Sequence, residues 1–342
     1  MLSKLAQRAL TPFAKALEHD DMARLGIDRT TRIARWWNRE RAPLVEFRRL
    51  AYESSFDALL DENGWPDTRE RLELVDGFYL DTSHTLPHLR QLIDQMDDVI
   101  DERGLQKWED LGKPYLQNIL AGDALERYPA LLDFGTSSRV LAAVAPSFQF
   151  IPHLSTSLPR GVRLQESSTK FDPTPTAPPR DSQNWHRDYH TEPTFYVITL
   201  IRDVTEECGP LHYVSASVSE RVTTALRYRT RHCSYRVTDA QFLSVVDPSE
   251  IKVLTGPPGT TLYIDSSACF HMGSRNPVSP RYQTQYAYAS PVKSDFSKIV
   301  RTKVAYPSRP EDSTLRRMLC DRDWTPPGAT LPRATARTAS LA

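Results

Sequence analysis

The amino-acid sequence predicts a mainly β protein with a helical N-terminal part (α+β), in which an antiparallel sandwich or barrel of the jelly-roll type is buttressed by helices. Apolar residues recur at helical spacing over residues 42–60 and 86–100, in the first third of the chain. From about Phe148 the sequence changes to short β-rich runs, which Pro, Gly and polar clusters separate. Many short strands without helices between them are typical of antiparallel sandwiches and barrels.

Helices are expected first along the chain. Residues 42–60 carry apolar side chains at helical spacing, and residues 86–100 do the same on one face. A third, shorter helix is expected over residues 139–145, because the Thr-Ser-Ser segment 136–138 can cap its start and Pro146 can close its end. The N-terminal part, residues 1–147, is therefore interpreted as a helical region packed on the core.

Residues 148–325 are interpreted as the catalytic β region. Its expected strands read FQFIPHL, VRLQESSTKF, FYVITLIRDV, LHYVSASV, FLSVV, IKVL, TTLYIDSSACFH and RYQTQYAYA. The segment 172–183 (DPTPTAPPRDSQ) is a proline-rich, extended loop, expected to act as a lid over a substrate. The last residues, 326–342, contain almost no core-forming side chains and are expected to be a disordered tail.

Composition narrows the possible partners. The 43 basic and 43 acidic side chains cancel, so the charge balance gives no reason to expect nucleic acid or an anionic membrane as partner. No apolar run approaches the length that spans a bilayer. The four cysteines are widely spaced and form no C-x-x-C pair, which fits a reducing, cytoplasmic location better than a disulfide framework. A small-molecule substrate remains the expected partner, and the oligomeric state stays open.

Candidate metal ligands lie in the segment Asn-Trp-His-Arg-Asp that ends at Asp188. Residues two apart on a strand point to the same face, so His186 and Asp188 would project together, opposite Arg187. A second histidine, His271, ends another expected strand 85 residues later, and Arg281 follows ten residues beyond it. Two histidines and a carboxylate on one face of an octahedral iron leave three adjacent positions open.

Those open positions suit a keto acid and O2. A keto acid chelates two positions and O2 takes the third, while the far carboxylate of the keto acid needs a buried cation. Arginine supplies that cation better than lysine does, because its guanidinium binds carboxylates in bidentate fashion. Arg281 is favoured over Arg275, because Arg281 opens an expected strand whereas Arg275 lies in the turn after His271.

The motifs W-H-R-D, E-C-G-P-L-H-Y-V-S-A-S and F-H-M-G-S-R-N, followed by Arg281, resemble the phytanoyl-CoA dioxygenase-like branch of the Fe(II)/2-oxoglutarate oxygenases. The likeness covers residues 148–292, about two-fifths of the chain. It implies a double-stranded β-helix (cupin-like), with iron on His186, Asp188 and His271. It also implies a salt bridge from Arg281 to 2-oxoglutarate. One departure is the stretch 215–218, which lacks the histidine usual in the family at a non-ligand position.

The resemblance also bears on the reaction outcome. Related halogenases carry Ala or Gly where this chain has Asp188, so the retained carboxylate favours hydroxylation of a small organic molecule, with release of succinate and CO2. The substrate could be a metabolite, a natural-product intermediate or an acyl thioester. Two alternatives stay open: a non-catalytic jelly-roll binding protein, and a cupin-type metalloenzyme that does not use 2-oxoglutarate.

Four further residues are candidates beside the metal ligands. Thr199 lies on the strand after the first two ligands and could reach the co-substrate carboxylate. Trp185 and His190 flank the ligand segment and could line a substrate pocket, although core packing for Trp185 and exposure for His190 are the ordinary alternatives. Cys269 shares a strand face with His271 by the two-residue rule, and its ordinary alternative is a small buried apolar residue.

Overall fold

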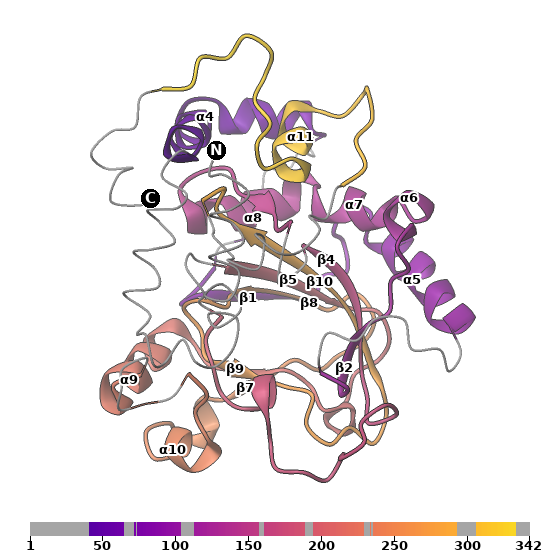
Figure 1. Cartoon of the computed structure of the whole chain (residues 1–342), viewed down its shortest axis with the longest axis vertical. Helices are drawn as coiled ribbons and strands as arrows, with labels where there is room; N and C mark the ends of the chain where they lie inside the picture. The colour runs from indigo at the N-terminus through magenta and orange to yellow at the C-terminus, as the bar shows by residue number, and fades with distance from the viewer. Residues whose placement is uncertain are drawn as a thin grey trace, which may run out of the picture.

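The computed structural model describes most of the chain, and the elements are labelled in Figure 1. The described residues are 41–64, 72, 74–103, 113–156, 161–188, 194–228, 233, 235–292 and 306–332. The expected N-terminal segment before residue 41 and the last ten residues of the expected tail lie outside them. Among the described helices, none is long and apolar enough to cross a membrane.

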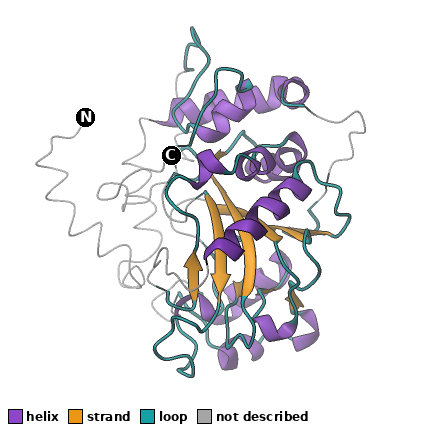
Figure 2. Cartoon of the chain, turned by 90° about the vertical axis from the view of Figure 1, so that its right-hand side faces the viewer, coloured by secondary structure: helices purple, strands orange, loops and turns teal. Residues whose placement is uncertain are grey.

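A layer of helices covers one face of a large sheet (Figures 1 and 2). Its members are α4 (Ala42–Glu62), α5 (Leu89–Arg103), α6 (Ala124–Arg127), α7 (Ala130–Gly135), α8 (Ser138–Phe148) and α11 (Thr314–Cys320). Arg48 links α4 to the end of α11 and to the segment that follows α8. Its fully buried guanidinium donates to the carbonyl oxygens of Ile151 and Pro152, and to three carbonyls at the end of α11. These bonds join segments that are far apart in the sequence.

The large sheet is antiparallel throughout, in the order β1-β8-β5-β10-β4-β2, with β3 also paired to β10. The strands are β1 (Phe78–Asp81), β2 (Leu116–Asn118), β3 (His153–Leu154), β4 (Val162–Ser167), β5 (Thr194–Leu200), β8 (Thr261–Asp265) and β10 (Arg281–Ala289). The long strand β10 pairs with β5 on one side and with β4 on the other, so these three strands form the centre of the sheet.

A small second sheet lies below the large one in Figure 1, in the order β7-β6-β9. Its strands are β6 (His212–Tyr213), β7 (Lys252–Val253) and β9 (His271–Met272). Two helices flank it, α9 (Ala216–Leu226) and α10 (Asp239–Leu243). The two sheets are in contact, because the ring of Phe78 in β1 meets the ring of Tyr213 in β6 edge-on at 5.1 Å.

Side chains of the large sheet alternate strictly between two surroundings. Val197 of β5 and Tyr286 of β10 belong to the apolar core that the helices share. Tyr196 and Ile198 of β5, with Ala287 of β10, belong instead to a core shared with the small sheet. We call the face that carries this second set the inner face. Since residues two apart share a face, each remaining strand residue can be assigned to one side.

Most of the expected elements form, and the differences have local causes. Helix α4 begins at the expected residue, and β10 coincides with the run RYQTQYAYA. The run FLSVV (242–246) is not a strand: a capping box at Thr238 and Gln241 starts helix α10 there. The expected strand over 211–218 ends at Tyr213, because the Ser215 hydroxyl accepts from the backbone N–H of Val218 and starts α9.

Three further observations concern the end of α8, the region before residue 148 and the tail. Pro146 does not close α8, which continues to Phe148 with the proline inside it. The region before residue 148, expected to be helical, also supplies β1 and β2 to the two edges of the large sheet. The described part of the expected tail, residues 326–332, contains turns and no helix or strand.

Candidate metal centre

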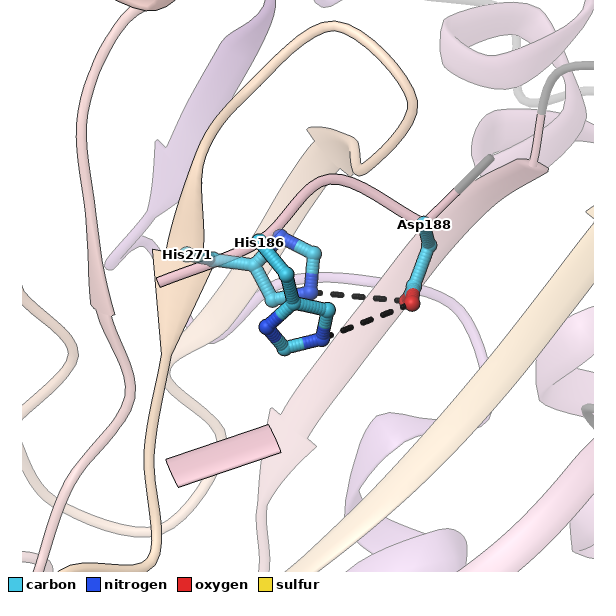
Figure 3. Close-up of side chains that lie close together, drawn as sticks. All are labelled: His186, Asp188 and His271. Atoms are coloured by element: carbon cyan, nitrogen blue, oxygen red, sulfur yellow. Dashed lines mark ion pairs between the residues drawn. The ribbon is translucent and has the colours of Figure 1, made fainter. Parts of the chain in front are cut away.

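His186, Asp188 and His271 converge on one point between the two sheets (Figure 3). Their ligand atoms all lie within 4.8 Å of one another. The Nε2 atom of His186 is 3.5 Å from Oδ1 of Asp188, and Nε2 of His271 is 3.4 Å from Oδ2. The side chains of the histidines are 4% and 9% exposed, and that of Asp188 is 19% exposed, so the group is buried yet open on the aspartate side.

The backbone holds the two histidines as hydrogen-bonded neighbours. The N–H of His186 donates to the carbonyl of His271 at 3.0 Å, and the N–H of His271 donates back at 2.9 Å. The N–H of Asp188 donates to the carbonyl of Ser266 at 2.8 Å. This bond attaches the third candidate ligand to the turn that follows β8. The spacing of the ligands is therefore set by main-chain pairing.

Each imidazole is oriented by a carbonyl oxygen two residues back in the chain. Nδ1 of His186 donates to the carbonyl of Asn184 at 2.9 Å, and Nδ1 of His271 donates to that of Cys269 at 3.1 Å. Burial, helped by the nearby positive charge of Arg236, lowers the pKa of His186 well below its usual value of 6.5. With Nδ1 donating to a carbonyl oxygen, each ring presents its Nε2 to the Asp188 carboxylate. Ligand atoms that converge in this way can hold a cation between them.

Arg281, at the start of β10, is 2% exposed and on the inner face. Its Nη2 donates to Oγ of Ser274 at 3.1 Å, while Nε and Nη1 have no hydrogen-bond partner among the described residues. Burial lowers its pKa to about 10, which still leaves the guanidinium charged at neutral pH. An enclosed cation with unsatisfied donors is strongly unfavourable unless a carboxylate or similar anion binds it.

Arg275, the other candidate for the co-substrate, already has partners. Its Nε donates to the carbonyl of Gln183 and its Nη1 to the carboxylate of Asp239, both at 2.6 Å. Both bonds fasten the turn after β9 to neighbouring segments. Of the two candidates, Arg275 has two hydrogen-bonded nitrogens, whereas Arg281 has one and two enclosed nitrogens without a partner among the described residues.

Thr199 does not face the site, which corrects the expectation for this residue. In β5 the inner face carries Tyr196 and Ile198, so Thr199 points to the helical side with Val197. Its hydroxyl lies 3.0 Å from that of Thr261 in β8, inside the core. Strand periodicity alone could not show which side was the inner one.

The three expected pocket residues have different outcomes. Trp185 lies in the core instead of the pocket: its ring stacks on Phe242 with centroids 3.9 Å apart, and its Nε1 donates to Asp239. Cys269 is fully buried among apolar side chains, with Sγ 3.6 Å from the carbonyl of Gly77, so it too is a core residue. His190 lies outside the described residues.

Sequence reasoning missed three residues: Tyr196 and Lys113, which interact electrostatically with Asp188, and Arg163, which interacts with both of them. Burial raises the pKa of Tyr196 well above 10, and the charge of Asp188 raises it further, so this hydroxyl lies beside the ligand carboxylate. Burial together with the charge of Arg236 lowers the pKa of Lys113 to about 8. Arg163 lies between Val162 and Leu164 in β4. This alternation of apolar and charged residues could have indicated that Arg163 lies on the other face of the sheet.

No protein-family model matches the chain, and no curated protein matches it. Among solved structures, EctD from S. alaskensis in its apoform is 15% identical with a TM-score of 0.43, over 70% of this chain and 82% of that chain. The epimerase SnoN from nogalamycin biosynthesis, in complex with Fe3+, alpha ketoglutarate and nogalamycin RO, is 13% identical with a TM-score of 0.40, over 82% and 94%.

HygX from Streptomyces hygroscopicus, with nickel, 2-oxoglutarate and hygromycin B bound, is 12% identical with a TM-score of 0.36, over 63% of this chain and 83% of that chain. All three TM-scores lie below 0.5.

Proposed function

We propose that the chain is an Fe(II)- and 2-oxoglutarate-dependent oxygenase of the phytanoyl-CoA dioxygenase-like kind. The observation that carries the proposal is the pairing of two features within one interior. His186, Asp188 and His271 supply two imidazoles and one carboxylate to a single point, and Arg281 adds a buried guanidinium with unsatisfied donors. A metal site alone explains the first feature, whereas an oxygenase that uses a keto acid explains both.

The donor set fits iron. Two imidazoles and one carboxylate are the ligands typical of non-haem Fe(II) oxygenases, and they leave open positions for other ligands. Among the described residues, no fourth His, Cys, Asp or Glu joins the group, so a closed structural zinc site is disfavoured. Iron bound here would supply the activation of O2, with 2-oxoglutarate as the source of electrons.

The protein residues act by binding and orientation. The carbonyls of Asn184 and Cys269 fix the tautomer of each histidine, which keeps Nε2 free for the metal. Arg281 and the Ser274 hydroxyl that it contacts would hold the far carboxylate of 2-oxoglutarate. The apolar side chains Ile198 and Ile264 on the inner face limit the access of water. None of the ligands needs to act as an acid or base.

The strand arrangement supports a double-stranded β-helix. The four central strands of the large sheet run in the order β8-β5-β10-β4, all antiparallel. The segment at Trp185 and His186 pairs with β9 through the His186–His271 bridge, and β9 continues through β6 to β7. Two facing four-stranded layers of this kind are expected for a jelly roll.

The reaction that we favour is hydroxylation of a small organic molecule with release of succinate and CO2. Asp188 occupies the coordinating position, so no metal site is left for halide. A binding protein that has lost turnover would not need an intact ligand set. A cupin-type metalloenzyme without 2-oxoglutarate would not need the unpaired guanidinium of Arg281.

The test is to mix metal-free protein anaerobically with Fe(II) and 2-oxoglutarate. We expect the visible charge-transfer band of an iron-bound keto acid, and then formation of succinate when O2 is admitted. Absence of the band in the wild-type protein would refute the use of 2-oxoglutarate. A protein that binds Fe(II) but gives no band would instead support the cupin-type alternative.

Replacing Arg281 by glutamine should weaken 2-oxoglutarate binding by about 30-fold or more, since removal of one partner of a buried charge pair costs about 2–5 kcal/mol. The measurement is titration of the charge-transfer band with 2-oxoglutarate. Fe(II) affinity should change little, because Arg281 is not a ligand. Arg90→Gln, at a side chain that is 95% exposed, is the matched control and should leave both affinities unchanged.

The loop 172–183 is proposed to cover the substrate. It is closed on itself by the Arg180–Asp172 ion pair, 2.5 Å from Nη2 to Oδ1, and runs directly into the ligand segment. Shortening the loop by deletion of residues 174–178 should raise the apparent KM for substrate and increase succinate formed per substrate consumed. Unchanged KM and unchanged coupling of succinate to product would show that the loop is not a lid.

A further inference from the structure

We propose that the site holds a second anion-binding position, centred on Arg163, which anchors a carboxylate of the organic substrate. The inference deepens the proposed function, on which it rests for the identity of the reaction, by naming the substrate class. The expected substrate is a small organic carboxylate with an apolar body. Arg281 would serve the co-substrate and Arg163 the substrate.

Arg163 is a buried cation on the inner face. It lies in β4, where its neighbours Val162 and Leu164 belong to the core beneath the helices. Its side chain must therefore point to the opposite side, and it is 8% exposed. Its Nη2 donates to Oε1 of Gln285 at 2.7 Å, which confirms that the side chain reaches across to the inner face of β10.

The guanidinium of Arg163 is incompletely satisfied. Nε is enclosed and has no hydrogen-bond partner among the described residues. Within the same part of the chain, no carboxylate lies within ion-pair distance of Arg163. By contrast, the other buried strand charge of β4, Glu166 on the helical side, is paired with Arg103. A buried arginine without an anion is unfavourable, so a ligand that supplies a carboxylate would stabilise it.

Arg163 lies near the metal ligands. Its positive charge lowers the pKa of the Tyr196 hydroxyl, which the charge of Asp188 raises, so both charges act on one group at the centre of the inner face. Lys113, just before β2, feels the charges of both Arg163 and Asp188. Arg163 and Asp188 therefore both act on Tyr196, and both act on Lys113.

The two buried arginines are separate positions. Register pairs Arg281 with Ser167 and Gln285 with Arg163, so the two lie four residues apart along β10. Four residues of strand span about 13 Å, which is longer than 2-oxoglutarate can bridge while it also chelates the metal. Between them, Gln283 donates to Gln165 at 3.2 Å and links β10 to β4. The separation along the strand favours two different anions for the two guanidinium groups.

The other half of the inner face is apolar, and it would contact the part of the substrate that lies away from the carboxylate. Ile198 of β5, with Leu262 and Ile264 of β8, continues the inner face away from β4. A ligand that places its carboxylate on Arg163 would lie with its body across Tyr196 and these aliphatic side chains. This division into a cationic half and an apolar half favours an amphipathic organic acid over a sugar or a polyamine.

The test uses benzoate and its neutral isostere benzamide as probes. Protein loaded anaerobically with Fe(II) and saturating 2-oxoglutarate is titrated calorimetrically with each. We expect benzoate to bind at least about tenfold more tightly than benzamide, and Arg163→Gln to remove the preference. Arg163→Lys keeps the charge and should restore part of it, while Arg90→Gln should match the wild type. Equal affinities for the two probes in the wild type, or an undiminished preference in Arg163→Gln, would overturn the proposal.

Two further measurements separate this inference from the proposed function. The charge-transfer band should form in Arg163→Gln with 2-oxoglutarate affinity within about twofold of the wild type. An affinity as low as that of Arg281→Gln would assign Arg163 to the co-substrate and overturn the inference. If the wild type gives no band at all, the same titrations on metal-free Arg281→Gln protein still decide whether Arg163 selects the carboxylate, since Arg281 can then no longer capture it.

Discussion

Replacing Asp188 by alanine should abolish both the charge-transfer band and succinate formation. The carboxylate is the only anionic ligand of the group, and both Nε2 atoms point at it. Loss of an outer partner of a metal ligand alone weakens metal affinity by about 10–100-fold, so loss of a direct ligand should exceed about 100-fold. The measurement is competition for Fe(II) with a chelator of known affinity.

The matched control for this variant is Asp94→Ala, at a side chain that is 69% exposed on α5. Its Fe(II) affinity and succinate yield should equal those of the wild type. An undiminished band in Asp188→Ala, with normal folding shown by circular dichroism, would contradict the assignment of the metal site. Loss of the band in both variants would point to the assay instead of the ligand.

Replacing Arg48 by methionine should destabilise the protein strongly, by about 3 kcal/mol or more, because buried carbonyls lose a charged donor. The fully buried guanidinium of Arg48 donates five hydrogen bonds, to Ile151, Pro152 and the three carbonyls at the end of α11. Methionine fills much of the volume but offers no donor. The free energy of unfolding in urea measures the loss.

Arg90→Met serves as the control for Arg48→Met, because the Arg90 side chain is 95% exposed. Its unfolding free energy should stay within about 0.5 kcal/mol of the wild type. If Arg48→Met were as stable as the wild type, the hydrogen bonds from Arg48 to the end of α11 would not contribute to folding stability. Fe(II) binding below the unfolding transition should remain, because Arg48 lies in the helical layer and not among the ligands.

The part of the candidate site that could be predicted from the sequence consists of residues that are close together along the chain. His186 and Asp188 are two residues apart on an extended segment, and such spacing alone brings them to one face. Residues whose role depends on absolute orientation could not be predicted. Thr199 and Tyr196 are both on β5, and only the packing of the sheets decides that Tyr196 and not Thr199 faces the metal ligands.

The fold could be predicted where patterns are long. Helix α4 and strand β10 are long, with 21 and 9 residues, and both form where expected. Residues 242–246 are mostly apolar and end in two valines, which favours a strand, but the capping box at Thr238 and Gln241 starts the short helix α10 just before them. Strands β1 and β2 have only four and three residues, and they form because the edges of the large sheet offer them partners.

The reciprocal main-chain bonds between His186 and His271 have a consequence for how the chain acquires its metal. Because main-chain hydrogen bonds set the spacing of these two residues, little conformational entropy should be lost there when a metal binds. In zinc fingers, by contrast, the metal must also drive folding. This chain is therefore expected to behave as a rigid chelator, which can exchange its metal while the sheets stay assembled.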